Sequence, residues 1–111
     1  LTGYIAGSYA TSLLADMGAD VIKVESPAGD GFRVIGGSFQ AWNRGKRGIV
    51  VDLRRPEGRE VVYELVRRAD LVAENFRPGA AARLGVDEPT LRALRPGLVY
   101  LSVSGYGGPG P

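Results

Sequence analysis

The chain contains no cysteine and no histidine. Without cysteine, these residues cannot form a disulfide framework, a thiol nucleophile or a cysteine-based metal site, and a reducing compartment such as the cytoplasm is expected. Without histidine, they lack the commonest general base and metal ligand in proteins. We therefore expect no metal site, and the sequence does not support a hydrolase with a serine–histidine–aspartate triad.

A strong charge of one sign is also missing, because the formal net charge is only +2. Nucleic-acid-binding domains usually carry a pronounced basic stripe, so we expect no nucleic-acid partner. No apolar run approaches the roughly 20 residues that cross a bilayer, so we expect no membrane span. Residues 1–14 lack a basic start and are interrupted by Gly3 and Gly7, so we expect no signal peptide there.

The 111 residues are enough for one domain at most. The chain starts without methionine, and residues 107–111 are rich in glycine and proline, as in a turn that leads onward. We interpret the whole range 1–111 as one portion of a longer protein.

Strand-like and helix-like patterns alternate along the chain. The predicted strands are 21–24, 48–53, 70–74 and 98–103; the predicted helices are 7–17, 39–42, 56–69, 80–84 and 89–94, and residues 1–6 end a strand or turn into the first helix. This alternation predicts an α/β fold: a Rossmann-like three-layer sandwich with a mostly parallel sheet.

Local signals predict how some elements begin, end and pack. Ser8 is a candidate N-cap of the first helix, where Ala10, Leu13, Leu14 and Met17 have helical spacing. Gly18 is a natural C-terminal stop. The strand 48–53 is apolar enough to be buried on both faces, and Asp52 near its end is a candidate cap for the helix that begins near Pro56.

Four cationic side chains lie between the first two strands, namely Arg33, Arg44, Lys46 and Arg47. Loops at strand ends commonly hold ligands in open α/β sheets, and these charges favour an anionic ligand. The alternative is a solvated charge run, with Asp30 and Arg33 in a surface ion pair. No Walker sequence and no correctly spaced dinucleotide fingerprint occurs, and residues 75–79 could offer a helix N-terminus to an anion. From the residues alone, no catalytic residue can be named.

Several blocks, in order along nearly the whole chain, resemble the N-terminal region of the family III CoA-transferases. That family includes formyl-CoA transferase, crotonobetainyl/carnitine CoA-transferase and the related 2-methylacyl-CoA racemases. The blocks that carry the resemblance include Leu-Leu-Ala-Asp-Met-Gly-Ala-Asp-Val-Ile-Lys-Val-Glu at 13–25, Asn-Arg-Gly-Lys-Arg at 43–47, Glu-Asn-Phe-Arg-Pro-Gly at 74–79, Arg-Leu-Gly at 83–85 and Ser-Gly-Tyr-Gly at 104–107.

The resemblance implies that range 1–111 is the Rossmann-like portion that binds coenzyme A or acyl-CoA. The positions that match the cofactor contacts of the family are Ile5, Ala6, Ser26, Val51, Asp52, Leu53, Arg54, Asn75, Phe76, Arg77 and Arg83. The chain departs from common family patterns at Ser8, where many members have proline, and at Ser26, where some have a basic residue.

The resemblance further implies an enzyme that moves coenzyme A between carboxylic acids through an aspartyl-CoA thioester, and an interlocked homodimer. The aspartate that carries this chemistry in the family lies beyond the segment that matches Pro111, so no catalytic residue is assigned here. Two alternatives stay open: a 2-methylacyl-CoA racemase, which would epimerise C2, and a truncated, non-catalytic CoA-binding paralogue.

Overall fold

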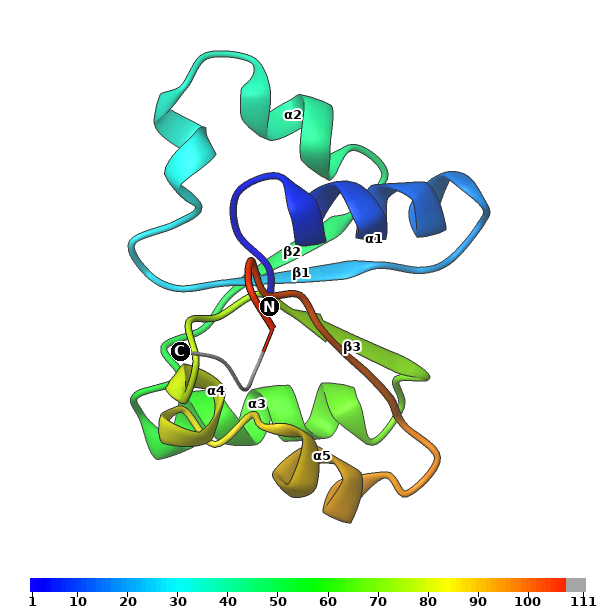
Figure 1. The fold of residues 1–111 in the computed structure, drawn as a ribbon, viewed down its shortest axis with the longest axis vertical. Coiled ribbons are helices and arrows are strands. Elements are labelled where there is room, and N and C mark those ends of the chain that lie inside the picture. The colour runs from blue at the N-terminus through cyan, green and yellow to red at the C-terminus, as the bar shows by residue number, and fades with distance from the viewer. Residues whose placement is uncertain (108–111) are drawn as a thin grey trace.

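The structure is a computed structural model that describes residues 1–107. The turn predicted at 107–111 therefore lies outside the described residues from 108 onward. The elements in chain order are α1 (Ala6–Asp16), β1 (Ile22–Glu25), the 3-10 helix η1 (Gly31–Val34), α2 (Ser38–Asn43), β2 (Arg47–Val50), α3 (Pro56–Val66), β3 (Leu71–Glu74), α4 (Ala80–Arg83), α5 (Glu88–Leu94) and β4 (Val99–Ser102) (Figure 1).

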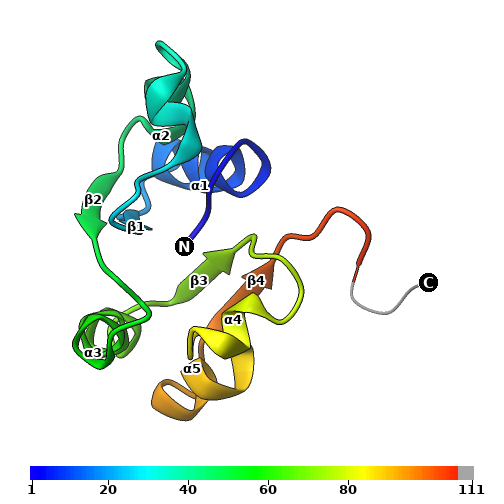
Figure 2. The ribbon, with the colours of Figure 1, turned by 90° about the vertical axis from the view of Figure 1, so that its left-hand side faces the viewer.

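The strands form two parallel pairs (Figures 1 and 2). β1 pairs with β2, with Ile22 opposite Arg47, and β3 pairs with β4, with Leu71 opposite Val99. The prediction of an α/β fold with parallel strands is confirmed. The described strands nevertheless form two separate ladders, where the sequence predicted one sheet.

The segment 1–3 lies between the two strand pairs and is not a strand. Lys23 of β1 donates a hydrogen bond to the Thr2 carbonyl oxygen (2.8 Å), and the Asn75 side chain after β3 both accepts from and donates to the Gly3 backbone (2.8 and 2.7 Å). Side chains therefore satisfy the backbone groups that a strand ladder would otherwise use. Of the two structures predicted for residues 1–6, the turn into the helix is the one observed.

Helix α1 begins earlier than its sequence signals predict. Ile5 is its N-cap and makes no capping hydrogen bond through its side chain, while Ser8 lies inside the helix and is fully buried. The predicted N-cap role of Ser8 is therefore wrong. The predicted stop is confirmed, since Gly18 follows the C-cap Met17 with a φ of +98°, which glycine adopts without strain.

Every buried apolar residue of the described chain lies in residues 51–107, which we call the second half; residues 1–50 are the first half. α3 contributes Val62 and Val66, and α5 contributes Leu91. The remaining buried apolar residues lie after β2, in or beside the second strand pair, or between α4 and α5: Val51, Leu53, Val72, Ala73, Leu98 and Val86. Burial of such side chains drives this half together, at about 1.5–3 kcal/mol for each large one.

The interior of the first half is polar. In β1 the buried side chains are Lys23 and Glu25, whereas Ile22 and Val24 are only partly buried. β2 is mostly exposed, with Val50 63% accessible, so the prediction that this strand is buried on both faces is wrong. Within residues 1–107, β2 pairs with β1 alone.

Helix α3 lies so close to the chain after β2 that position 58 has no room for a side chain. A Cβ atom at Gly58 would lie 2.1 Å from the backbone oxygen of Asp52, whereas one at Gly97 would meet nothing within 4 Å. We expect Gly58→Ala to lower the free energy of unfolding by about 1–3 kcal/mol through overpacking, although alanine ordinarily favours helices. Gly97→Ala, the control, should change it by less than about 0.5 kcal/mol. Urea denaturation measures both, and equal values would contradict the close approach.

Candidate functional site

A cavity of about 510 Å³ lies at the carboxyl ends of β1, β2 and β3. Its walls come from residues 1–4, 24–30, 51–54 and 75–77, with Leu84 from the segment after α4. Ligands of open parallel α/β folds bind at this edge, outside the carboxyl ends of the strands. The volume is also in the ordinary range for a small-molecule site.

Most of the predicted cofactor-binding residues meet in this cavity. Those that line it are Ser26, Val51, Asp52, Leu53, Arg54, Asn75, Phe76 and Arg77. Ile5, Ala6 and Arg83 are not among the lining residues. Ile5 and Ala6 lie at the start of α1, and Arg83 ends α4, one residue before Leu84, which does line the cavity.

Asp52 and Arg54 form one side of the mouth. The Arg54 guanidinium donates two hydrogen bonds to the Asp52 carboxylate (2.8 and 2.9 Å), and the Arg54 backbone N–H donates a third (3.1 Å). These bonds lower the pKa of Asp52 to about 2. The predicted capping role of Asp52 is wrong, because Arg55 is the N-cap of α3 and no side chain caps that helix.

Arg77 is the other cationic lining residue. It is exposed and forms no ion pair within residues 1–107, unlike Arg33, Arg44 and Arg47. Its neighbours are held in place by β3: the Phe76 N–H donates to the buried Glu74 carboxylate (2.7 Å), and Asn75 is bonded to Gly3. The Arg77 donors therefore project from a fixed backbone.

Residues 75–79 lead into a helix, as predicted, because α4 begins at Ala80 and Gly79 is its N-cap. The helix has four residues, which is too short to build a substantial macrodipole. An anion at this wall would therefore meet side-chain donors such as Arg77 and not a helix dipole.

The cationic run between the first two strands does not reach the cavity, so the predicted cationic mouth is wrong at these positions. Arg44 pairs with Asp16 (2.6 Å), and Arg47 pairs with Asp20 (2.5 Å). Lys46 turns inward and donates to the carbonyl oxygens of Ser8 and Trp42 (2.7 and 3.0 Å). Burial, reinforced by the charge of the nearby Lys23, lowers the pKa of Lys46 to about 8.

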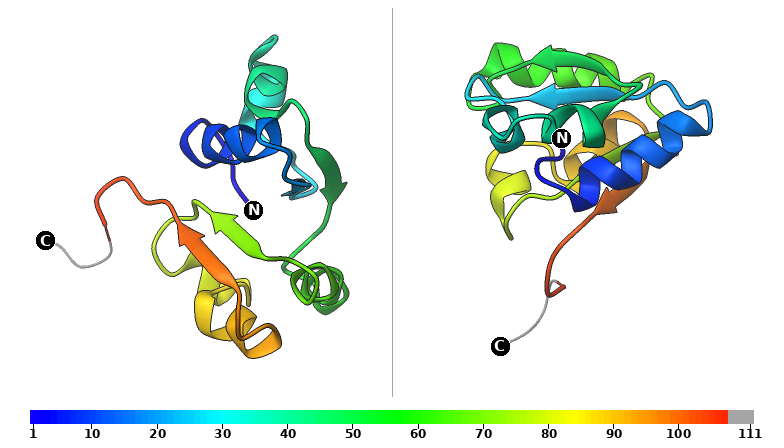
Figure 3. Two further views of the ribbon diagram at one scale, coloured as in Figure 1. Left: turned by 90° about the vertical axis from the view of Figure 1, so that its right-hand side faces the viewer. Right: turned by 90° about the horizontal axis from the view of Figure 1, so that it is seen from above.

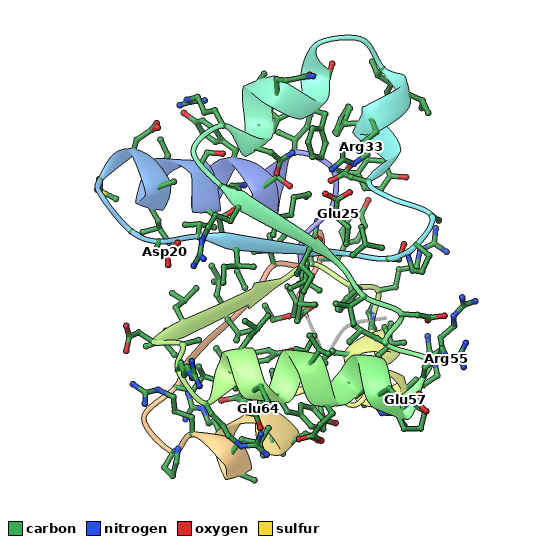
Figure 4. All side chains as sticks on the ribbon, turned by 180° about the vertical axis from the view of Figure 1, so that it is seen from behind. Asp20, Glu25, Arg33, Arg55, Glu57 and Glu64 are labelled. Carbon is green, nitrogen blue, oxygen red and sulfur yellow. The ribbon has the colours of Figure 1, made fainter. Side chains whose placement is uncertain are left out.

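Arg33 also has a different partner from the predicted one. Its guanidinium grips the Glu25 carboxylate through two hydrogen bonds of 2.7 Å, and its charge lies over the Phe39 ring at 3.8 Å from the centroid. Figure 4 shows the Arg33 and Glu25 side chains directed toward each other. The proposed surface pair between Asp30 and Arg33 is therefore wrong.

Asp30 instead pairs with the buried ammonium group of Lys23. Their side chains are 1% and 4% exposed and lie 2.8 Å apart, and Lys23 also donates to Thr2 and, at 3.5 Å, to Ser8. Asp30 accepts a further hydrogen bond from the Phe32 N–H (2.9 Å). Although burial raises the pKa of Asp30, these hydrogen bonds and the Lys23 charge outweigh it and lower the pKa overall.

This network fixes the wall formed by residues 26–30. The two ends of this loop are bonded to each other: at one end β1 supplies Lys23 and Glu25, and at the other Asp30 contacts both. The Asp30 carboxylate accepts from Lys23, and the Asp30 backbone N–H donates to the Glu25 carboxylate (3.1 Å). Sequence reasoning missed this arrangement. The available signal was a lone lysine within an otherwise apolar strand, followed seven residues later by an aspartate.

Within residues 1–107, no cluster of three or more carboxylate, histidine or cysteine side chains could hold a metal ion. Among the described helices, none combines the length and apolar character needed to cross a bilayer. The cavity lining combines apolar side chains, amide and backbone groups, the carboxylates of Glu25, Asp30 and Asp52, and the two arginines Arg54 and Arg77.

Comparison with known proteins decides the family. The model of CoA-transferase family III matches residues 1–111. The chain belongs to CoA-transferase family III. The predicted resemblance is confirmed, and the cavity lies in the part of the family III chain that these residues represent.

The family III relatives are similar over the whole chain. The succinate–glutarate CoA-transferase of Agrobacterium fabrum is 45% identical over 100% of this chain and 32% of its own length, and the succinyl-CoA:mesaconate CoA-transferase of Haloarcula hispanica is 46% identical over 98% and 31%. A solved CAIB/BAIF family protein of Brucella suis has a TM-score of 0.95 at 45% identity, covering 100% of this chain and 32% of that one. A hypothetical protein of Mycobacterium tuberculosis has a TM-score of 0.93 at 40% identity, with 98% and 32% covered. This chain thus spans about a third of the length of these relatives.

The buried pair of Lys23 and Asp30 should dominate the stability of the first half. We expect Lys23→Met to lower the free energy of unfolding by about 3–5 kcal/mol, because it leaves the Asp30 charge buried without a partner. Arg47→Met is the matched control, since it breaks an ion pair whose side chains are 66% and 71% exposed; it should cost at most about 1 kcal/mol. Denaturant titration that gave equal losses would contradict the role of the buried pair.

The Glu25–Arg33 pair predicts a loss of stability in acid. Hydrogen bonds from Arg33 hold the pKa of Glu25 below its ordinary value of 4.5 in the folded protein. Its contribution is therefore complete above pH 4.5 and is lost as the pH falls through the lower folded pKa. We expect Glu25→Gln to be less stable at neutral pH and to lose less further stability between about pH 6 and about pH 3. An acid limb as steep as that of the wild type would exclude Glu25 as a cause.

Proposed function

We propose that the full-length protein is a CoA-transferase that moves coenzyme A between carboxylic acids, and that the cavity at the strand ends binds the CoA moiety. The observation that carries this proposal is the convergence of residues 51–54 and 75–77, from separate strand pairs, on one cavity in a family III chain. Two of the relatives are named as a succinate–glutarate and a succinyl-CoA:mesaconate CoA-transferase, which makes succinyl-CoA the first donor to test.

The chemistry of the lining fits this ligand. Within residues 1–107, Arg77 offers a guanidinium without an ion-pair partner, and Arg54 offers an exposed one that is held by two hydrogen bonds to Asp52. Arginine donors bind phosphate oxygens with charge-assisted hydrogen bonds. Phe76 and the apolar side chains of Val51 and Leu53 supply a surface for the less polar parts of the molecule. In this proposal residues 1–107 bind and orient the ligand.

The covalent step is proposed for an aspartate of the full-length protein beyond the segment that matches Pro111. Its carboxylate oxygen attacks the donor thioester carbonyl, so that a mixed anhydride forms and the CoA thiolate leaves. The thiolate then attacks the aspartyl carbonyl and releases the donor acid, which yields the aspartyl-CoA thioester. The acceptor carboxylate reverses these two steps. A cytoplasmic location and an interlocked homodimer belong to the same proposal.

The activity test uses the full-length protein with succinyl-CoA and a panel of free carboxylic acids. We expect new acyl-CoA products, detected by liquid chromatography and mass spectrometry, in amounts equal to the succinate released. Exchange of the C2 proton of a 2-methylacyl-CoA without transfer to free acids would identify a racemase instead. Binding of CoA with neither reaction would leave the non-catalytic alternative.

Arg77 tests the assignment of the cavity. We expect Arg77→Ala to weaken CoA binding to the full-length protein by about 1.5–3 kcal/mol, roughly 10- to 150-fold in Kd, because a charge-assisted hydrogen bond to phosphate is lost. Arg83→Ala tests the neighbouring residue that the resemblance implies. Arg92→Ala on α5, which breaks only a half-exposed ion pair with Glu88, is the control and should leave the Kd unchanged. Calorimetry that finds wild-type affinity in Arg77→Ala and Arg83→Ala would remove the phosphate assignment.

A further inference from the structure

Helix α1 buries small, mostly polar residues and exposes large apolar ones, which is the opposite of an ordinary surface helix. Its buried residues are small and mostly polar: Gly7, Ser8, Thr11 and Ser12. Large apolar side chains at intervals of four lie on its outer face and are 42–75% exposed: Ile5, Tyr9, Leu13 and Met17. We call these four residues the α1 stripe. Because residues four apart lie on one helical face, the stripe is continuous along the whole helix.

The exposure of the stripe is not offset by apolar burial elsewhere in this half. None of the buried apolar residues of the described chain lies in residues 1–50. The inner face of α1 is held by hydrogen bonds: Ser12 donates to the carbonyl oxygens of Ser8 (3.0 Å) and Trp42 (2.5 Å), and Thr11 donates to that of Gly7 (2.9 Å). The buried side chains of the first half are thus polar, and its large apolar side chains are exposed or only partly buried.

Aromatic residues extend the stripe at one side and at the N-terminal end. The Tyr9 ring packs edge-to-face on Trp42 of α2 at 5.6 Å between centroids, and Tyr4, just before the helix, is 67% exposed. Contiguous apolar surface of this kind marks a contact surface in soluble proteins. An isolated exposed leucine or methionine would need no such explanation, but four in register along one helix do.

We propose that the α1 stripe packs against another part of the same polypeptide, through a complementary apolar surface beyond residue 107. The relatives are about three times as long as the matched region, so a family III protein has ample chain to supply this surface. The segment after β4 leaves the molecule on the side of the strand pairs where α1 lies (Figures 2 and 3). A tethered surface also has an effective concentration in the millimolar range, far above that of a free partner.

The geometry of the stripe specifies the kind of surface it takes. Side chains at i and i+4 form the ridge that packs into the groove of a crossing helix, so an apolar helical face is the fitting counterpart. The Asp16–Arg44 ion pair lies half-exposed beside the stripe and would form part of a polar rim. The first half would then acquire from this contact the apolar burial that it lacks within residues 1–50.

Matched lysine substitutions in the full-length protein test the proposal by stability. Leu13 on α1 and Val61 on α3 are 42% and 43% exposed, and both helices have 11 residues. We expect Leu13→Lys to lower the Tm by roughly 5 °C or more, because the charge is forced into an apolar contact, whereas Val61→Lys should shift it by at most about 2 °C. Leu13→Met should restore nearly the wild-type Tm. Equal, small shifts for both lysine variants would overturn the proposal.

Hydroxyl-radical footprinting of the unaltered full-length protein gives a second test that needs no folded variant. We expect Met17 and Tyr9 to be oxidised at least roughly tenfold more slowly than in the urea-unfolded protein, although Met17 is 75% exposed in residues 1–107. Oxidation of Met17 at the unfolded rate would overturn the proposal. A photo-cross-linking residue placed at Leu13 that joins two copies, seen at twice the chain mass in a denaturing gel, would also overturn it and would assign the stripe to a second copy. Neither readout involves catalysis, so failure of the proposed activity would leave this inference untouched.

Discussion

The buried ammonium group of Lys23 is the interaction on which the first half of the molecule depends. It ties together the segment 1–3, helix α1 and the loop after β1 through Thr2, Ser8 and Asp30. A buried charge is costly to desolvate, and here three oxygen acceptors compensate it, one of which, the Asp30 carboxylate, carries a full counter-charge. Because each of these partners lies on a different segment, the same group that satisfies the charge also fixes the relative positions of those segments. The wall of the cavity at residues 26–30 is a consequence of this arrangement.

The two halves of the chain are stabilised by different physics, and the cavity lies where they meet. The second half has an ordinary apolar core built from α3, α5 and the second strand pair. The first half has a polar interior, in which Glu25 binds Arg33 and Lys46 binds backbone carbonyl oxygens. Polar networks are directional, so they position loop atoms more sharply than nonspecific apolar contacts do. The ligand-facing residues 51–54 and 75–77 are held on one side by α3 and on the other by Glu74 and Asn75.

Much of the architecture could be predicted because it follows from local pattern. The helices near Pro56, at 80–84 and at 89–94, the short α2 and all four strands occur within a few residues of their predicted bounds. Glycine after α1 and proline at the start of α3 are local signals that no tertiary contact overrides. The cavity residues at 51–54 and 75–77 were predictable for a related reason, since parallel strands bring their carboxyl ends to one edge whatever their order.

The sequence by itself determined the alternation of helices and strands, the parallel pairing and the family, because each depends on residue periodicity or on residue identity along the chain. Only the tertiary structure decided which faces point inward and which charges meet. β1 has the same period of two whether its apolar or its charged residues are buried, and the choice of Lys23 and Glu25 depends on Thr2, Asp30 and Arg33. Likewise α1 has a clear apolar face, yet its burial depends on what packs there. Partner choice is a property of three-dimensional distance, which a one-dimensional pattern does not contain.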